Sequence, residues 1–227
     1  MIRAVLFDVG GPLNTEETHE RLFDEHIRAE LAGAGFAVTD AAYADAARWA
    51  VDSFAANTYQ AIIWRLTGQQ AGVAEQVYRA VAQHPRAGFE VRAGMPELLA
   101  ELHTRGLLLG VVANQPPHVV ETLEAIGIKR YFTSLGISEI EGLRKPDPRL
   151  FLAVCHALAV PPAECIMVGD RIDNDIAPAR QLGMRTVLLR SGRHQAQQPR
   201  SWLEVPDVEV RDAAGVRAAI LALLARS

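Results

Sequence analysis

The chain has 227 residues, of which 49% are hydrophobic and 22% charged, a composition ordinary for one globular domain or for a domain that carries an insertion. Its net charge of -4 provides no basic surface, so we expect neither nucleic acid nor an anionic membrane surface as a partner. The N-terminus lacks the layout of a signal peptide, and no apolar run approaches a membrane span in length. The two cysteines, Cys155 and Cys165, lie in apolar contexts without metal-ligand spacing, which predicts reduced thiols and a cytoplasmic protein.

The first predicted element is an almost wholly apolar run, residues 2–7, which ends at Asp8 and is followed by the turn residues Gly10 and Gly11. Such a run predicts a strand buried on both faces of a parallel sheet. Asp8 then lies at the carboxyl end of the strand, where open α/β sheets bind ligands. An aspartate before two glycines is also an ordinary way to end a strand, so this segment alone does not establish a site.

A long helical stretch follows the first strand. Residues 20–83 carry helical patterns without an intervening strand pattern, and Asp40 is the expected cap of the second helix. We therefore predict an inserted all-helical cap domain at residues 16–87, packed over the carboxyl edge of the sheet. The core domain then consists of residues 1–15 and 88–227. The alternative is a helical subdomain that makes no contact with the site.

Strands and helices alternate in the rest of the chain. Short apolar runs predict strands, and the segments between them predict helices; the strands are expected at residues 107–113, 132–137, 165–168 and 186–189. With right-handed crossovers this pattern predicts an α/β fold, a Rossmann-like doubly wound parallel sheet. Residues 191–206 are expected to form a surface loop, and residues 213–224 a closing helix.

Polar residues follow three of the predicted strands. Asp8 ends the first strand, Asn114 the second, and the acidic run at residues 169–175 the fourth, and these strand ends converge in one parallel sheet. Lys145 lies between the last two, in a segment fixed by prolines. Two or three carboxylates around a hard divalent cation, with one lysine balancing the charge, suit the handling of phosphate. Taken alone, the acidic run is equally consistent with a solvated turn.

The order and spacing of these motifs over nearly the whole chain resemble the haloacid dehalogenase (HAD) superfamily, of the type with a helical C1 cap. The matching residues are Asp8 after a strand, Ala113-Asn114, Lys145-Pro146, and Gly169-Asp170 with Asn174-Asp175. The resemblance implies that Asp8 is the nucleophile and that Lys145 stabilises the anion. It also implies Mg2+ as the cofactor, held by Asp8, the Gly10 carbonyl and Asp170 and oriented by Asn174 and Asp175, with Gly11, Asn114 and Lys145 binding the substrate.

The chain departs from the phosphatase pattern at two positions. The phosphatases that the chain resembles have a second aspartate, the general acid and base, at the position of Gly10. At the position of Ala113 they have Ser or Thr. Loss of a general acid/base costs about 10² to 10⁴ in rate, and loss of one anion-stabilising donor about 10² to 10³. We therefore predict a Mg2+-dependent hydrolase of small phosphate esters whose activity is weakened or altered. Candidate substitute acids are Glu16, Glu17 and His19.

Two other functions stay open at this stage. A carbon–halogen hydrolase is the first. The family branch with that activity has a Ser-x-Asn pattern in the last motif, whereas this chain has Gly169-Asp170, the metal-binding version, which disfavours this function. A phosphate-binding or protein-binding module without activity is the second. The phosphonate-cleaving branch is disfavoured, because it uses a lysine of the cap and residues 16–87 contain none. Substrate identity and oligomeric state do not follow from the sequence.

Overall fold

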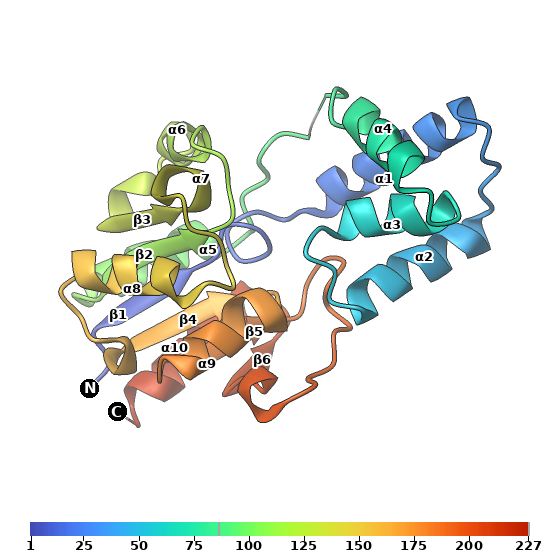
Figure 1. The fold of residues 1–227 in the computed structure, drawn as a ribbon. Coiled ribbons are helices and arrows are strands. Elements are labelled where there is room, and N and C mark those ends of the chain that lie inside the picture. The colour runs from blue at the N-terminus through green and yellow to red at the C-terminus, as the bar shows by residue number, and fades with distance from the viewer. Residues whose placement is uncertain (86, 227) are drawn as a thin grey trace. The chain divides into compact units, whose positions relative to one another are not determined.

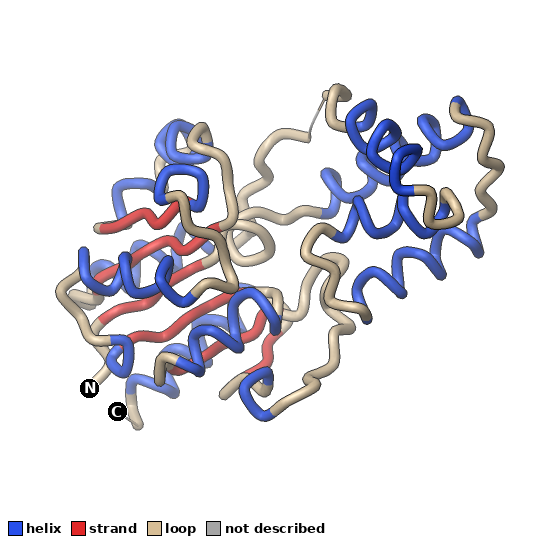
Figure 2. Tube along the Cα trace, viewed as in Figure 1, coloured by secondary structure: helices blue, strands red, loops and turns tan. Residues whose placement is uncertain are grey.

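The computed structural model describes residues 1–85 and 87–226. The chain divides into two compact units, one formed by Met1–Thr15 with Phe89–Ser227 and the other by Glu16–Gly88 (Figure 1). The first unit contains a sheet flanked by helices, whereas the second is helical (Figure 2). Within the described residues, no helix is long and apolar enough to cross a membrane.

The sheet of the first unit has six parallel strands in the order β3-β2-β1-β4-β5-β6. Their bounds are β1 Ala4–Phe7, β2 Leu108–Ala113, β3 Ser134–Ile137, β4 Cys165–Gly169, β5 Arg185–Leu189 and β6 Val208–Val210. The strand order reverses at β1, because its two neighbours β2 and β4 come from opposite halves of the chain. This confirms the predicted doubly wound α/β fold, and the switch point beside β1 is where such sheets bind ligands.

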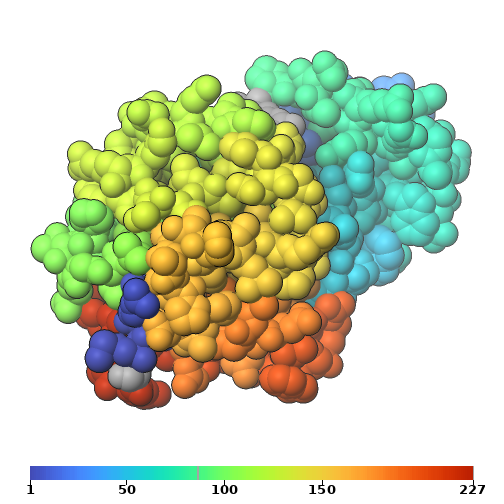
Figure 3. All heavy atoms as spheres, turned by 60° about the vertical axis from the view of Figure 1, so that its left-hand side comes forward, coloured from blue at the N-terminus to red at the C-terminus, as the bar shows by residue number. Residues whose placement is uncertain are grey.

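Helices cover both faces of the sheet, because successive side chains of β1 point to opposite faces and are apolar on both. Val5 and Phe7 point into one core with helices α5, α6 and α10, and Ala4 and Leu6 point into another with α8 and α9. The helix bounds are α5 Met95–Thr104, α6 Val119–Ala125, α7 Ser138–Glu141, α8 Pro148–Ala157, α9 Ala177–Gln181 and α10 Ala213–Leu224. In the space-filling view, the yellow to orange atoms of the segment that contains α8 and α9 form a continuous surface (Figure 3).

Helix α8 approaches the sheet closely because two strands carry glycine beneath it. A Cβ atom at Gly110 would lie 2.8 Å from Cγ1 of Val154, and one at Gly136 would lie 2.5 Å from Cγ2 of the same residue. Asp147 begins the helix by accepting a hydrogen bond from the Arg149 backbone N–H, and Pro148 follows at a position that needs no donor. The segment just before α8, which carries Lys145, is therefore held at a fixed place beside the sheet.

The second unit packs four helices around its own apolar core. The helices are α1 Glu17–Gly33, α2 Asp40–Asp52, α3 Thr58–Leu66 and α4 Ala71–Val81. Ile27, Ile62 and Val81 are among the side chains buried where they meet. The expected cap of the second helix is wrong by one residue: Thr39 accepts the hydrogen bond from the Ala42 N–H, and Asp40 is the first helical residue.

Two further differences from the prediction lie near the C-terminus of the first unit. β6 falls after the expected loop and was not predicted, because its three residues, Val208–Val210, are too few to show a strand period. The segment between β4 and β5, which the alternation of strands and helices predicts as a helix, begins with a π-helical turn, η3 (Ile172–Ile176), and continues as the short α9. Short 3-10 turns at η1 Lys129–Tyr131, η2 Pro162–Glu164 and η4 Trp202–Glu204 complete the fold.

Candidate active site

Three carboxylates meet at the carboxyl edge of the sheet. Asp8 follows β1, Asp170 follows β4, and Asp175 lies in η3, and one oxygen atom of each lies within 4.8 Å of the others. Phe7 pairs with Val168 in the parallel register, so β1 and β4 end side by side. The convergence predicted from the sequence therefore exists for these three residues.

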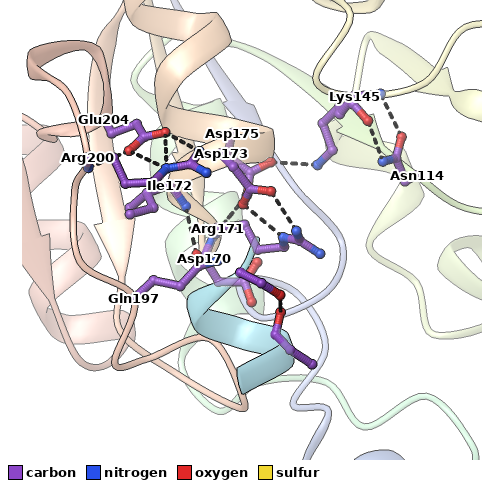
Figure 4. Close-up of polar contacts among 12 residues, drawn as sticks. Asn114, Lys145, Asp170, Arg171, Ile172, Asp173, Asp175, Gln197, Arg200 and Glu204 are labelled. Atoms are coloured by element: carbon purple, nitrogen blue, oxygen red, sulfur yellow. Dashed lines mark hydrogen bonds and ion pairs between the residues drawn. The ribbon is translucent and has the colours of Figure 1, made fainter. Parts of the chain in front are cut away.

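Lys145 is the cation of this cluster. Its Nζ lies 2.8 Å from Oδ1 of Asp8 and 2.6 Å from Oδ1 of Asp175, and its side chain is 1% exposed (Figure 4 shows the contact with Asp175). Burial lowers the pKa of the Lys145 ammonium, but the carboxylates of Asp175 and Asp8 outweigh burial and hold the pKa above its usual range. The lysine therefore carries a positive charge between the two acids.

Asn114 holds the backbone of this lysine. Its Nδ2 donates to the Lys145 carbonyl oxygen at 3.0 Å, and its Oδ1 accepts from the Lys145 N–H at 2.8 Å (Figure 4). Both ends of the carboxamide are thus engaged with a segment 31 residues further along the chain. The observed role of Asn114 is to position Lys145, a role that the sequence analysis missed; its role in binding substrate stays a prediction.

Asp175 is fully buried and both of its carboxylate oxygens have partners. Oδ1 faces Lys145, while Oδ2 accepts hydrogen bonds from the backbone N–H groups of Asp170 at 3.2 Å and Arg171 at 3.0 Å. Gly169 allows this placement, because a Cβ atom there would lie 2.3 Å from the Asp175 Cβ. Asp175 therefore orients the Asp170 segment and the lysine. Asn174, its neighbour in η3, is half-buried.

Asp8 is the most accessible of the three acids, with 14% of its side chain exposed. Burial raises the pKa of the Asp8 carboxyl to about 6; the Lys145 ammonium opposes this shift, and the Asp175 carboxylate adds to it. The Val9 backbone N–H and Lys145 both contact Oδ1, at 2.7 and 2.8 Å. At pH 7 and above, Asp8 is therefore largely ionised and held in one orientation.

The loop after Asp8 contains glycine for a steric reason. Gly11 has a φ of 75°, and a Cβ atom on it would lie 2.6 Å from the Cβ and 2.7 Å from the Cγ of Asp170. Gly11 thus lets the loop after Asp8 pack directly against Asp170. Ala113, which together with Gly10 departs from the expected phosphatase pattern, is fully buried in the apolar core beside α5 and α6.

The donor set fits a hard divalent cation. Three carboxylates face one lysine, which leaves excess negative charge at a buried edge, and oxygen atoms are the ligands that Mg2+ prefers. Because both oxygens of Asp175 are engaged, the members of this cluster best able to hold the ion are the carboxylates of Asp8 and Asp170. Asp175 supports them from outside.

The comparison with known families identifies the family of the chain. Residues 2–183 match the family model described as "Hydrolase: haloacid dehalogenase-like hydrolase". The chain belongs to the haloacid dehalogenase-like hydrolases. The family predicted from the spacing of the motifs is thereby confirmed.

Several relatives of this HAD-like hydrolase are named phosphatases. It is 39% identical over 113 residues to a glyceraldehyde 3-phosphate phosphatase of Methanopyrus kandleri, an alignment that covers 49% of this chain and 48% of the relative. It is 32% identical over 161 residues to a phosphoserine phosphatase of Thermus thermophilus, and this alignment covers 69% of this chain and 63% of the relative. The chain spans about half of the length of the first curated relatives that it matches.

Solved structures share the fold over almost the whole chain. A predicted phosphoglycolate phosphatase from Haemophilus somnus superposes with a TM-score of 0.70 at 21% identity and covers 98% of both chains. The HAD hydrolase YfnB from Bacillus subtilis, which was solved bound to magnesium, superposes with a TM-score of 0.67 at 18% identity. The superposition covers 96% of this chain and 98% of the YfnB chain. At these identities the likeness shows the fold of the HAD-like hydrolase alone.

An ion pair that was not predicted from the sequence lies beside the acids of this hydrolase. The Arg171 guanidinium binds both carboxylate oxygens of Asp173, and both side chains are largely buried (Figure 4). The sequence contains Arg-x-Asp directly after Asp170, a spacing at which the two side chains can pair. An arginine that pairs within an acidic run is hard to recognise without the fold. The pair compensates part of the charge of the acidic run.

Proposed function

We propose that this protein is a Mg2+-dependent hydrolase of small phosphate monoesters. The observation that carries the proposal is the buried ammonium of Lys145 between Asp8 and Asp175, with Asp170 beside them. Buried carboxylates and a paired cation at a sheet switch point suit the binding of a metal ion and a phosphate. The names of the relatives, which are phosphatases of small molecules, support the same substrate class.

In this proposal Asp8 is the nucleophile. A carboxylate oxygen of Asp8 attacks phosphorus, the bond from phosphorus to the ester oxygen breaks, and the alcohol leaves as its oxyanion, which takes a proton from solvent water. Water then attacks the phosphorus of the aspartyl phosphate, releasing inorganic phosphate and restoring Asp8, so that one water is consumed for each ester. Lys145 stabilises the negative charge of the transferring group at a site where little water screens it.

Asp8, Asp170 and the carbonyl of Gly10 would hold the ion, and Asn174 and Asp175 would orient this set. Mg2+ bound there would supply positive charge that stabilises the phosphate oxygens and would help to align the phosphorus with Asp8. Gly11, through its backbone, and Lys145 are the proposed phosphate contacts. The helical unit, residues 16–87, is proposed to act as the cap domain that selects the substrate.

The glycine at position 10 shapes the proposed activity. No side chain stands there to protonate the leaving group or to activate water, so both halves of the reaction lack a general acid/base from this position. The loss is worth about 10² to 10⁴ in each affected step. The preferred substrates are therefore esters whose alcohol leaves readily, or substrates that meet an acid from Glu16, Glu17 or His19.

The test is hydrolysis of p-nitrophenyl phosphate by the wild type, Asp8→Asn and Asp170→Ala, with Mg2+ binding followed by calorimetry. We expect Mg2+-dependent release of p-nitrophenol by the wild type, no release by Asp8→Asn, and weakened Mg2+ binding by Asp170→Ala. A folded wild type without hydrolysis at millimolar Mg2+ would overturn the proposal. Halide release from a 2-haloacid under the same conditions would instead identify the carbon–halogen alternative.

A further inference from the structure

Arg92 holds the loop that carries the nucleophile at two points. Its Nε donates to the carbonyl oxygen of Gly11 at 2.5 Å, and its backbone N–H donates to the carbonyl oxygen of Leu13 at 2.9 Å. The side-chain contact joins residues 81 positions apart in the sequence. A guanidinium that binds a backbone carbonyl contributes a charged donor with fixed geometry, and such hydrogen bonds are stronger than those between neutral groups.

The backbone around Arg92 is itself tied to the same loop. The Asn14 side chain accepts from the Glu90 N–H at 2.7 Å, the Thr15 N–H donates to the Glu90 carbonyl at 2.8 Å, and Asn14 forms an antiparallel bridge with Val91. The Asn14 N–H also donates to the Val9 carbonyl at 2.9 Å. Arg92 therefore projects from a short two-stranded ribbon that is anchored to the residue after the nucleophile.

Gly11 is the point where this ribbon meets the acids. The position of a Cβ on Gly11 is already occupied by the Asp170 side chain, 2.6 Å away, so a displacement of Gly11 changes its contact with Asp170 directly. Two successive glycines also leave this loop with more conformational freedom than other residues would allow. Without an external anchor, Gly10 and Gly11 would therefore sample several backbone orientations.

We propose that Arg92 is a positioning residue, which fixes the carbonyl of Gly11 and so aligns the Gly10 carbonyl with the carboxylates of Asp8 and Asp170. Its effect on Mg2+ rests on the proposed function, whereas its effect on the loop does not. The assignment also accounts for how a Gly-Gly loop can serve a metal site, because the constraint that a side chain at position 10 would add comes from Arg92. Groups that orient metal ligands typically change metal affinity about 10- to 100-fold when removed.

The experiment compares Arg92→Met and Arg92→Lys with a matched control, Arg217→Met, which removes a surface arginine paired with Glu101 in the same unit. Hydrogen exchange of the peptide that covers residues 9–14 reports on the loop, and calorimetry gives the Kd for Mg2+. For Arg92→Met we expect faster exchange confined to the loop and a Kd for Mg2+ that rises about tenfold. Arg92→Lys, which keeps a charged donor, should recover part of the exchange protection and part of the Mg2+ affinity. Arg217→Met should change neither the exchange of the loop nor the Kd for Mg2+.

The two readouts separate the failure of this inference from failure of the proposed function. If the wild type binds no Mg2+, the proposed function fails, and the exchange data alone still decide whether Arg92 orders the loop. Unchanged exchange in a folded Arg92→Met would overturn the assignment, and so would loosening of the whole unit rather than of residues 9–14. If Arg92→Met does not fold, Arg92→Lys decides by the same criterion, with intermediate exchange and affinity supporting the role.

Discussion

Two sets of residues near Asp8 are built very differently. In the first, the paired set, Lys145 and Asp175 are buried and paired, and Asn114 binds the Lys145 backbone through both ends of its carboxamide. In the second, the reduced set, Gly10 and Ala113 lack the side chains that the phosphatase pattern has at these positions. In the proposed reaction, the paired set would orient Asp8 and stabilise the charge of the transferring group, whereas the reduced set lacks a side chain for proton transfer to the leaving group. The proposed site therefore keeps the groups that orient Asp8 and lacks those that assist departure of the alcohol.

Removal of the lysine should have the largest effect. Lys145→Met leaves Asp8 and Asp175 as buried carboxylates without a cation, so we expect a loss of about 3 to 5 kcal/mol in the free energy of unfolding. Activity toward p-nitrophenyl phosphate should fall about 10²- to 10³-fold or more. Denaturant unfolding and steady-state kinetics measure both.

The second lysine of the chain provides the matched control. Lys129 pairs with Glu124 on the surface, and Lys129→Met should change the free energy of unfolding by at most about 1 kcal/mol and leave activity unchanged. Equal effects of the two substitutions would mean that the paired set contributes nothing particular to the site.

Restoring a carboxylate in the reduced set, at position 10, should have the next largest effect. Gly10→Asp should accelerate the first chemical step about 10²-fold or more for an alkyl phosphate, and much less for p-nitrophenyl phosphate, because only the alkoxide needs the proton. The positive φ recorded in this loop belongs to Gly11, so an aspartate at position 10 does not meet that constraint. Rapid-quench kinetics with both esters measure the step, and Gly10→Ala separates the effect of the carboxylate from that of adding a Cβ. No selective gain for the alkyl ester would show that the site has diverged further.

The support of Lys145 by Asn114 should have a smaller effect. Asn114→Ala removes two hydrogen bonds to the Lys145 backbone, and we expect a loss of about 1 to 3 kcal/mol in stability and about tenfold in kcat. Asn114→Asp keeps the acceptor for the Lys145 N–H and should lose less. If only KM changed in both variants, Asn114 would be a substrate contact, as the sequence analysis predicts.

The ionisation of Asp8 should give the smallest effect. With a pKa of about 6, Asp8 is half protonated at pH 6, and Mg2+ favours the carboxylate, so binding should release about half a proton at pH 6 and almost none at pH 8. Calorimetry in buffers with different ionisation enthalpies counts these protons. Asp8→Asn should abolish the release at pH 6, and persistence of the release would assign the proton to another group.

Local patterns in the sequence predict most of the fold and the acids of the site. The buried strands show as apolar runs that end in Asp8, Asn114 and Asp170, and parallel strand ends must converge. The partners of these residues are not visible in the same way. Asn114 reaches Lys145 across 31 positions and Arg92 reaches Gly11 across 81, and neither contact leaves a periodic or spaced pattern. β6 was not predicted because its three residues, Val208–Val210, are too few to establish the alternation of a strand.

The most direct test of the account is the pre-steady-state release of p-nitrophenol. The nitrophenolate leaves without a proton, whereas hydrolysis of the aspartyl phosphate lacks a base at Gly10, so phosphorylated Asp8 should accumulate. We predict a burst of about one p-nitrophenol per protein molecule that requires Mg2+ and disappears in Asp8→Asn. Linear release without a burst, together with undiminished hydrolysis by Asp8→Asn, would contradict the assignment of Asp8 as the nucleophile.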